Sequence, residues 1–371
     1  MQTVTLPLFA GCAARARRLL FVPALAALLA GAQNVLAADV LSTAADTIIP
    51  PPGRAAPAPP GAREAQPPGQ GQVSIADFSV VEVRGTALSN ARTSENLGRN
   101  RQGGGIVIDD KGLVLTIGYL VVETEKIEIV GVDGGRVPAT LVAYDSATGV
   151  GLIRAAVPLP VKPIAFAESD GASVSDPVLV VGFDGVAPAY IVSRREFAGT
   201  WEYLLDEALF TAPATTGWSG AALINREGKL LGVGSLLVPD ALGEDRPLAG
   251  NMFVPVDAVK PILNDMVANG KPSGPPRPWL GVNVQDLHGR LLVTRVSREG
   301  PAERSGIAEG DIILGLDGQA LKDSADFYRR LWDSGAAGVE VQLDVLKGNA
   351  IATIPIRTME RAQYLRPPPM Y

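Results

Sequence analysis

Between residues 75 and 255 the chain repeats one pattern, in which short apolar runs rich in β-branched residues are separated by glycine, proline and aspartate. Runs of this length predict β-strands, and the residues between them favour tight turns. The runs include FSVVEVRG, GGGIVIDDKGLVLTIG, KIEIVGVDGGRVPATLVAYD, VGLIRAA, DPVLVVGFDG, AYIVSRREFAG and TAPATTGWSGAALINREGKLLGVGSLLV. Many short strands without helical periodicity between them indicate an antiparallel barrel or sandwich.

A second pattern begins near residue 256. VPVDAVKPILNDMVANG spaces its apolar residues three to four apart and ends at Gly270, which predicts a helix. After a proline-rich linker, residues 278–358 alternate strand-like and helix-like segments, which predicts a small α+β domain. Ser324 is the expected N-cap of the helix in SADFYRRLWDSG.

The first residues have the composition of an export signal. Arg15, Arg17 and Arg18 precede the apolar run LLFVPALAALLAGA, and small residues suited to cleavage follow near Ala37. This combination is typical of a secretory signal peptide, and an uncleaved membrane anchor is the alternative. The expected organisation is a signal peptide at 1–37, a proline-rich disordered linker at 38–74, a first folded domain at 75–270, a linker at 271–277, a second folded domain at 278–358 and a tail at 359–371.

The acidic, cysteine-poor composition excludes several classes of function. Cleavage of the signal removes Cys12, the single cysteine, so the mature chain has no disulfide, thiolate nucleophile or cysteine metal ligand. It also removes three arginines and no acid, which moves the net charge from −6 to about −9. Such a chain is unsuited to nucleic acid, whose phosphates need a basic face. No cofactor or metal is expected, because the glycines at 103–105 precede a strand and no histidine–cysteine cluster exists.

The stretch TTGWSGAAL places Ser219 in a small-residue turn of the kind that presents a nucleophilic hydroxyl. A serine hydroxyl reacts only when a neighbouring base removes its proton. The single histidine, His288, lies in VQDLHGRLL, a whole domain away from Ser219. A serine–lysine dyad is the alternative. The lysines considered for it are Lys111, Lys126, Lys162 and Lys229.

The order of these segments resembles the HtrA/Deg family, in which an exported trypsin-like double β-barrel precedes a PDZ domain. GGGIVIDDKGLVLT resembles the strand pair leading to the catalytic histidine, and ATGVGLIRA resembles the segment holding the aspartate. TGWSGAALINREGKLLGVGS resembles the nucleophile loop, NMFVPVDAVKPIL the last strand and helix of the protease domain, and RPWLGVNV the carboxylate-binding loop of a PDZ domain. The resemblance covers residues 78–358 and implies a mainly β fold with a small α+β PDZ domain, in the periplasm.

The resemblance places the family's triad on Tyr119, Gly149 and Ser219, so that tyrosine replaces the histidine and glycine the aspartate. The separations of 30 and 70 residues fit the family's layout. Neutral tyrosine is a poor proton acceptor, and glycine has no side chain with which to orient one. In subtilisin, loss of the histidine alone lowers kcat by about 2 × 10⁶. Ser219 is therefore expected to be a vestigial nucleophile, with Gly217 and Ser219 at the oxyanion-hole positions.

Further departures and a second site follow from the same resemblance. Trp218 replaces a small polar residue and Ala221 replaces a glycine, so the indole is expected to fill or cover the substrate side of the turn. In the PDZ-like domain, a loop of backbone N–H groups receives a peptide's terminal carboxylate, while the strand edge pairs with the peptide. That loop consists of Trp279, Leu280, Gly281 and Val282. The alternative is a groove occupied by the chain's own protease domain.

Together these interpretations predict a non-catalytic HtrA-like protein, a pseudoprotease. It would bind C-terminal peptides or unfolded envelope proteins through its PDZ groove, as a scaffold, a chaperone or a regulator of an active HtrA-type protease. One alternative is an active periplasmic serine endopeptidase that uses Ser219 with an unrecognised base. Another is a structural assembly factor without peptide binding. The resemblance also implies a homo-oligomer, a trimer formed through the start of the barrel.

Overall fold

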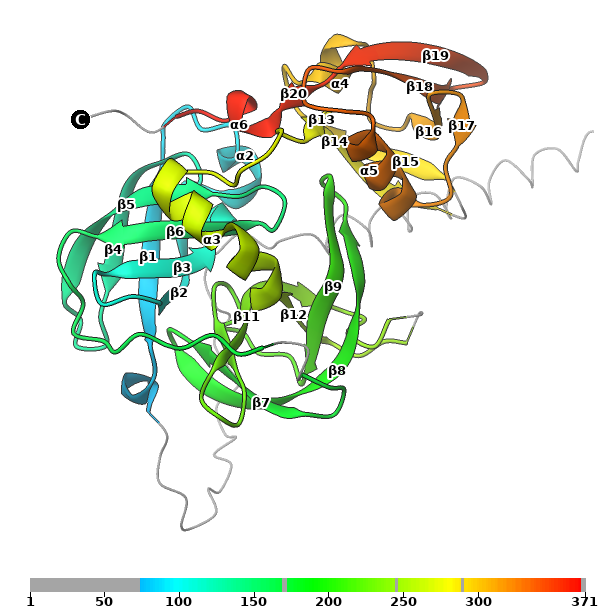
Figure 1. Ribbon diagram of the computed structural model, residues 1–371. Helices are drawn as coiled ribbons and strands as arrows, with labels where there is room; N and C mark the ends of the chain where they lie inside the picture. Colours follow the sequence, from blue (N-terminus) through cyan, green and yellow to red (C-terminus); the bar gives the residue numbers. More distant parts are fainter. Residues whose placement is uncertain (1–73, 169–171, 244–245, 288–289, 368–371) are drawn as a thin grey trace, which may run out of the picture. The chain divides into compact units, whose positions relative to one another are not determined.

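The structure is a computed structural model that describes residues 74–168, 172–243, 246–287 and 290–367 (Figure 1). The expected signal peptide, the linker up to residue 73 and His288 lie outside the described residues. The described chain consists mainly of β-strands, which form two closed barrels followed by a smaller mixed domain. This confirms the mainly β, double-barrel fold predicted from the strand pattern.

The first barrel closes in the order β1-β2-β3-β6-β5-β4. Its strands are β1 (Val80–Ala87), β2 (Asn100–Val107), β3 (Leu113–Ile117), β4 (Thr124–Val130), β5 (Arg136–Tyr144) and β6 (Val150–Ala155). Apolar side chains fill its interior, among them Ile106, Leu115 and Ile153, which are fully buried. Full burial of such a side chain stabilises the fold by about 1.5–3 kcal/mol. The short apolar runs form strands because barrel closure buries one face of each run.

The second barrel closes in the order β10-β11-β12-β9-β8-β7. Its strands are β7 (Pro177–Gly182), β8 (Gly185–Gly199), β9 (Tyr203–Ala212), β10 (Ala222–Ile224), β11 (Leu230–Val238) and β12 (Gly250–Pro255). β8 and β9 form its longest hairpin, visible in green in Figure 1. Their pairing runs from Tyr190 opposite Ala212 to Gly199 opposite Tyr203, so residues 200–202 form the hairpin tip.

Helices occupy few positions in the barrel part of the chain. The predicted helix after β12 is α3 (Val256–Asn269), and Gly270 ends it in the left-handed conformation with φ 73°. That conformation favours glycine because it has no Cβ. The shorter helical elements are η1 (Ile75–Asp77), α2 (Ser94–Leu97) and η2 (Gly118–Leu120). Within the described ranges, no helix has the length and apolar character that a membrane span requires.

The C-terminal domain is the predicted small α+β unit. Its sheet has the order β14-β15-β16-β18-β19, with β17 paired to β16. The elements are β13 (Pro278–Trp279), β14 (Val282–Asp286), β15 (Leu291–Val296), α4 (Pro301–Arg304), β16 (Ile312–Leu316), β17 (Gln319–Ala320), α5 (Ser324–Asp333), β18 (Glu340–Lys347), β19 (Ala350–Arg357), β20 (Met359–Glu360) and α6 (Arg361–Tyr364). Phe327, Tyr328 and Leu331 of α5 are fully buried against this sheet.

The prediction that Ser324 caps α5 is wrong. Asp323 is the N-cap, and its side chain accepts a hydrogen bond of 2.7 Å from the Asp326 N–H. Ser324 is the first helical residue, and its hydroxyl donates to Asp286 at 2.6 Å. Aspartate and serine are both good caps, so the choice depends on a contact with β14 that the local sequence does not contain.

The segment after residue 358, expected to be a tail, forms structure as far as α6. β20 pairs with β13, and the Tyr364 ring lies 4.7 Å from the Trp279 ring. The Tyr364 hydroxyl donates to the Arg298 carbonyl at 2.9 Å, and the Arg366 N–H donates to Glu123 at 2.8 Å. The chain therefore returns from the second domain to the first barrel.

Candidate functional site

Ser219 lies in a tight turn between β9 and β10, and backbone hydrogen bonds join this turn to β11 and to β2. Gly220 has φ 70°, and its N–H donates to the Gly234 carbonyl at 2.9 Å. The Gly104 N–H donates to the Ser219 carbonyl at 2.7 Å, which joins the turn to β2 of the first barrel. A Cβ on Gly103 would lie 2.7 Å from Ser219 Oγ. The glycines of β2 therefore allow the nucleophile turn to approach the first barrel closely.

The hydroxyl of Ser219 is hydrogen-bonded to the phenol of Tyr119. Tyr119 Oη, from η2, lies 2.9 Å from Ser219 Oγ and also donates to the Ser235 carbonyl at 3.1 Å. Burial raises the pKa of Tyr119 above its ordinary value of 10.0, while the bond with Ser219 lowers it. The phenol therefore keeps its proton at neutral pH and is unsuited to accept one from Ser219. Among the described side chains, Tyr119 is the one hydrogen-bonded to Ser219 Oγ.

Arg101 fixes the backbone that carries Tyr119, and the sequence analysis did not identify it. Arg101 is 3% exposed, and its guanidinium donates to the carbonyls of Tyr119 at 3.0 Å and Val122 at 2.6 Å. It also donates to the Thr93 hydroxyl at 2.7 Å. Burial lowers the pKa of Arg101 to about 10, so it stays charged at neutral pH. The planar guanidinium matches several carbonyls at once, which suits it to this position.

The aspartate position of the predicted triad is closed by packing. Gly149 has φ 76°, in the left-handed region, and a Cβ there would lie 3.2 Å from Tyr203 Cε2. Tyr203 is 2% exposed, and its hydroxyl donates to the Thr148 carbonyl at 2.8 Å. A side chain at position 149 would therefore meet a fixed aromatic ring. The structure brings Tyr119 and Ser219 together. At the third position of the triad, the Tyr203 ring of β9 occupies the space that a side chain on residue 149 would need.

Trp218 packs against the tyrosine that contacts Ser219. The two rings lie edge to face, with centroids 6.4 Å apart and an interplanar angle of 64°. Trp218 is half-buried. Ala221 is fully buried in the second barrel. On the other flank, Asp184 is in contact with Gly217, one of the two residues assigned to the oxyanion hole.

Two of the lysines considered as bases have their amines in ion pairs with acidic side chains. Lys126 pairs with Glu128 at 3.0 Å, and Lys229 pairs with Glu227 at 2.9 Å.

The loop assigned to carboxylate binding in the C-terminal domain holds a carboxylate from the chain itself. The carboxylate of Glu202, at the tip of the β8–β9 hairpin, accepts hydrogen bonds from three backbone N–H groups. Leu280 donates at 3.0 Å, Gly281 at 2.6 Å and Val282 at 3.0 Å. Gly281 has φ 84°, and a Cβ there would lie 3.0 Å from Trp279, so the loop needs glycine.

The side chain of Glu202 is shielded from bulk solvent and lies near the positive charge of Arg361. Glu202 is 4% exposed, and burial raises its pKa to about 7, while the three N–H groups and the charge of Arg361 lower it. Burial raises the pKa of the Tyr328 phenol, and the nearby charge of Glu202 raises it further. A cavity of about 20 Å³ lies beside Glu202 and Arg361, roughly the room for one water.

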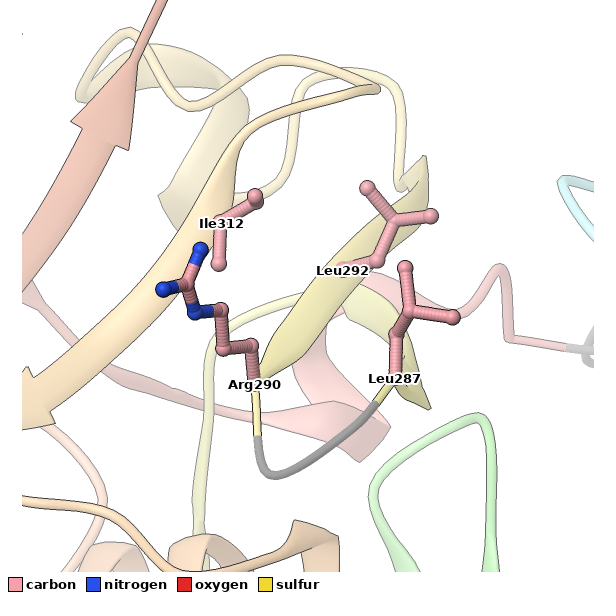
Figure 2. A pocket seen from close by; sticks show the side chains of 4 residues that line it. All are labelled: Leu287, Arg290, Leu292 and Ile312. Atoms are coloured by element: carbon pink, nitrogen blue, oxygen red, sulfur yellow. The ribbon is translucent and has the colours of Figure 1, made fainter. Parts of the chain in front are cut away.

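The fourth predicted loop residue, Trp279, contributes packing. It is 7% exposed and lies in β13 against Tyr364. A separate cavity of about 280 Å³ in the same domain is mostly apolar and contains none of the predicted site residues (Figure 2). Its lining residues are Leu287, Arg290, Leu292 and Ile312.

Comparison with known families matches both parts of the chain. Residues 103–233 match the trypsin-like peptidase domain, and residues 278–358 match the PDZ domain. Among curated proteins, the putative serine protease HhoA of Synechocystis sp. is 26% identical over 290 residues, covering 70% of this chain and 71% of the relative. A probable periplasmic serine endoprotease, DegP-like, of Rickettsia prowazekii is 27% identical over 279 residues, covering 69% of this chain and 52% of the relative.

The chain thus spans about half the length of the DegP-like relative. Among solved structures, an HtrA-type protease AlgW with decapeptide is 21% identical, with a TM-score of 0.47, and the match covers 80% of this chain and 100% of that one. A serine endoprotease from Yersinia pestis is 21% identical, with a TM-score of 0.47, covering 78% of this chain and 99% of that one.

Proposed function

The chain belongs to the HtrA/Deg family, with a trypsin-like peptidase domain before a PDZ domain, and on this premise we propose that it is a non-catalytic member that binds C-terminal peptides. Its ligands would be peptides or unfolded envelope proteins that present a free terminal carboxylate. The names of the DegP-like relatives support a periplasmic location. There it would act as a scaffold, a chaperone or a regulator of an active HtrA-type protease.

The observation that carries the proposal is the partner of Ser219. A catalytic serine needs a base that accepts its proton and later returns it to the leaving group. The partner here is the phenol of Tyr119, which stays protonated, and Tyr203 fills the space next to Gly149. Asp184 also places a carboxylate beside Gly217, which opposes the negative charge that an oxyanion hole must stabilise.

Peptide binding is supported by the geometry of the loop at residues 280–282. Its three N–H groups converge on a single carboxylate, that of Glu202, at 2.6–3.0 Å. Charge-assisted hydrogen bonds of this kind are about twice as strong as neutral ones. A peptide's terminal carboxylate has the same donor requirement as the Glu202 side chain, so the loop is chemically suited to bind one.

The catalytic half of the proposal is tested with a fluorophosphonate probe, which labels activated serines. Wild-type protein and Ser219→Ala are expected to label equally weakly, with trypsin as the positive control. Neither should degrade β-casein. Labelling or degradation by wild type that disappears in Ser219→Ala would contradict the proposal and favour the active endopeptidase.

The binding half is tested with two pools of fluorescein-labelled decapeptides that end in leucine, one with a free carboxylate and one with a terminal amide. Only the carboxylate pool is expected to bind the full chain. Gly281→Ala should abolish this binding, because its Cβ would contact Trp279 and Ser297. Gly274→Ala is the control, since Gly274 also has a positive φ but open space around it. No binding up to millimolar peptide would favour the assembly role.

A further inference from the structure

The tip of the β8–β9 hairpin makes two contacts of the kind that a peptide ligand makes with a PDZ domain. Its Glu202 side chain fills the loop of N–H groups at residues 280–282. Next to it, the Thr200 carbonyl accepts a hydrogen bond of 2.8 Å from the Val284 N–H of β14. A carboxylate in the loop and backbone pairing along the strand are the two main-chain elements of peptide recognition by this type of domain.

The same tip also contacts the helix of the PDZ domain. The Tyr328 hydroxyl of α5 donates to the Gly199 carbonyl at 2.8 Å. Leu204, the second residue of β9, is 8% exposed and packs within the apolar cluster that contains Leu280, Val282 and Tyr328. The hairpin tip therefore touches the carboxylate loop, β14 and α5, and it buries an apolar side chain among their residues.

The backbone of this tip is strained. Glu202 has φ 53°, a left-handed conformation that a non-glycine residue with a long side chain seldom adopts. Such a conformation persists only where surrounding contacts enforce it. The contacts here are the three N–H bonds to the carboxylate, together with ion pairs of Arg329 with Glu196 and with Asp206 on either side of the tip.

We propose that residues 200–204 are an internal ligand that closes the PDZ domain, and that a free C-terminal carboxylate binds by displacing Glu202 from the loop. This inference rests on the proposed function, because it concerns the same carboxylate site. Displacement would release the hairpin tip, and with it one end of the second barrel, from the PDZ domain.

A tethered ligand competes strongly because its effective concentration reaches the millimolar range for short connections. The apparent dissociation constant of an external peptide equals its intrinsic value divided by the open fraction of the protein. If the tip occupies the loop in nine molecules out of ten, release of the tip tightens peptide binding about tenfold.

The test compares the full chain with Glu202→Gln, which removes the charge and one acceptor oxygen while keeping the shape of the side chain. Glu207→Gln is the matched control, since Glu207 lies on the same hairpin, is exposed and pairs with Arg194 outside the loop. Two measurements are made on each variant: the affinity for the carboxylate-ended decapeptide pool, and amide hydrogen exchange in residues 280–284. The amide-ended pool serves as the negative ligand.

Glu202→Gln is expected to bind the carboxylate pool at least about tenfold more tightly than wild type and to exchange faster at residues 280–284 without peptide. Glu207→Gln should match wild type in both measurements. Measurable but equal peptide affinity of wild type and Glu202→Gln, or peptide binding with unchanged exchange, would overturn the internal-ligand inference and leave the proposed function standing. Faster exchange in Glu202→Gln with no peptide binding by any variant would support the internal contact and overturn the proposed function.

Discussion

Replacement of Gly149 by alanine tests whether packing closes the aspartate position of the triad. Gly149 has φ 76°, and a Cβ there would lie 3.2 Å from Tyr203 Cε2 and 3.5 Å from Tyr203 Oη. The left-handed backbone alone costs an L-residue about 1–2 kcal/mol. Overpacking against a side chain that is fixed in place costs a further 1–3 kcal/mol, roughly. The free energy of unfolding should therefore fall by about 2–5 kcal/mol.

Gly228→Ala is the matched control for this prediction. Gly228 has the same φ of 76°, but nothing lies within 4 Å of the place where its Cβ would be. This variant should lose only the backbone cost, about 1–2 kcal/mol. The difference between the two variants isolates the packing against Tyr203, as measured by urea unfolding followed by circular dichroism.

Tyr203→Leu provides the second arm of the experiment. If the Tyr203 ring is the obstacle, the extra cost of Gly149→Ala over Gly228→Ala should disappear when both are introduced into Tyr203→Leu. Equal costs for Gly149→Ala and Gly228→Ala in the wild-type background would refute the reasoning. An extra cost that persists in Tyr203→Leu would also refute it, since the clash would then lie elsewhere.

Two more predictions follow from the same site. Tyr119→Phe removes the hydroxyl bonded to Ser219 and Ser235, so unfolding should become easier by about 0.5–1.5 kcal/mol in urea titrations, with no change in fluorophosphonate labelling. Arg101→Met leaves the carbonyls of Tyr119 and Val122 without a donor, which should cost about 1–3 kcal/mol by the same measurement, and no loss would contradict its positioning role.

The fold was predictable because its signals are local. Short β-branched runs bounded by glycine and proline become strands in both barrels, and the apolar spacing before Gly270 becomes α3. The contact between Tyr119 and Ser219 was also within reach, since the family's register places both residues at one site.

The contacts that decide the chemistry of both sites could not be read from the sequence, because they join distant segments. Glu202 bonds to N–H groups 78 to 80 residues away, and in the sequence it is an ordinary acidic residue in a hairpin turn. The sequence does not indicate the positive φ of Glu202, since glycine or asparagine would be expected at such a position. Tyr203 next to Gly149 and Arg101 below Tyr119 likewise depend on how the barrels close. The sequence allowed the alternative of a groove filled by the chain's own protease domain. It did not identify Glu202 as the residue that enters the carboxylate loop.

The return of the chain after residue 358 bears on how the PDZ domain can be studied apart from the barrels. Excision at residue 358 would remove β20, the pairing partner of β13, and Tyr364, whose ring covers the indole of Trp279. The truncated fragment would present a bare tryptophan and an unpaired strand, both of which promote self-association. An autonomous fragment should therefore extend at least to Tyr364, and affinity tags are better fused beyond Pro367 than at the domain limit suggested by the family pattern.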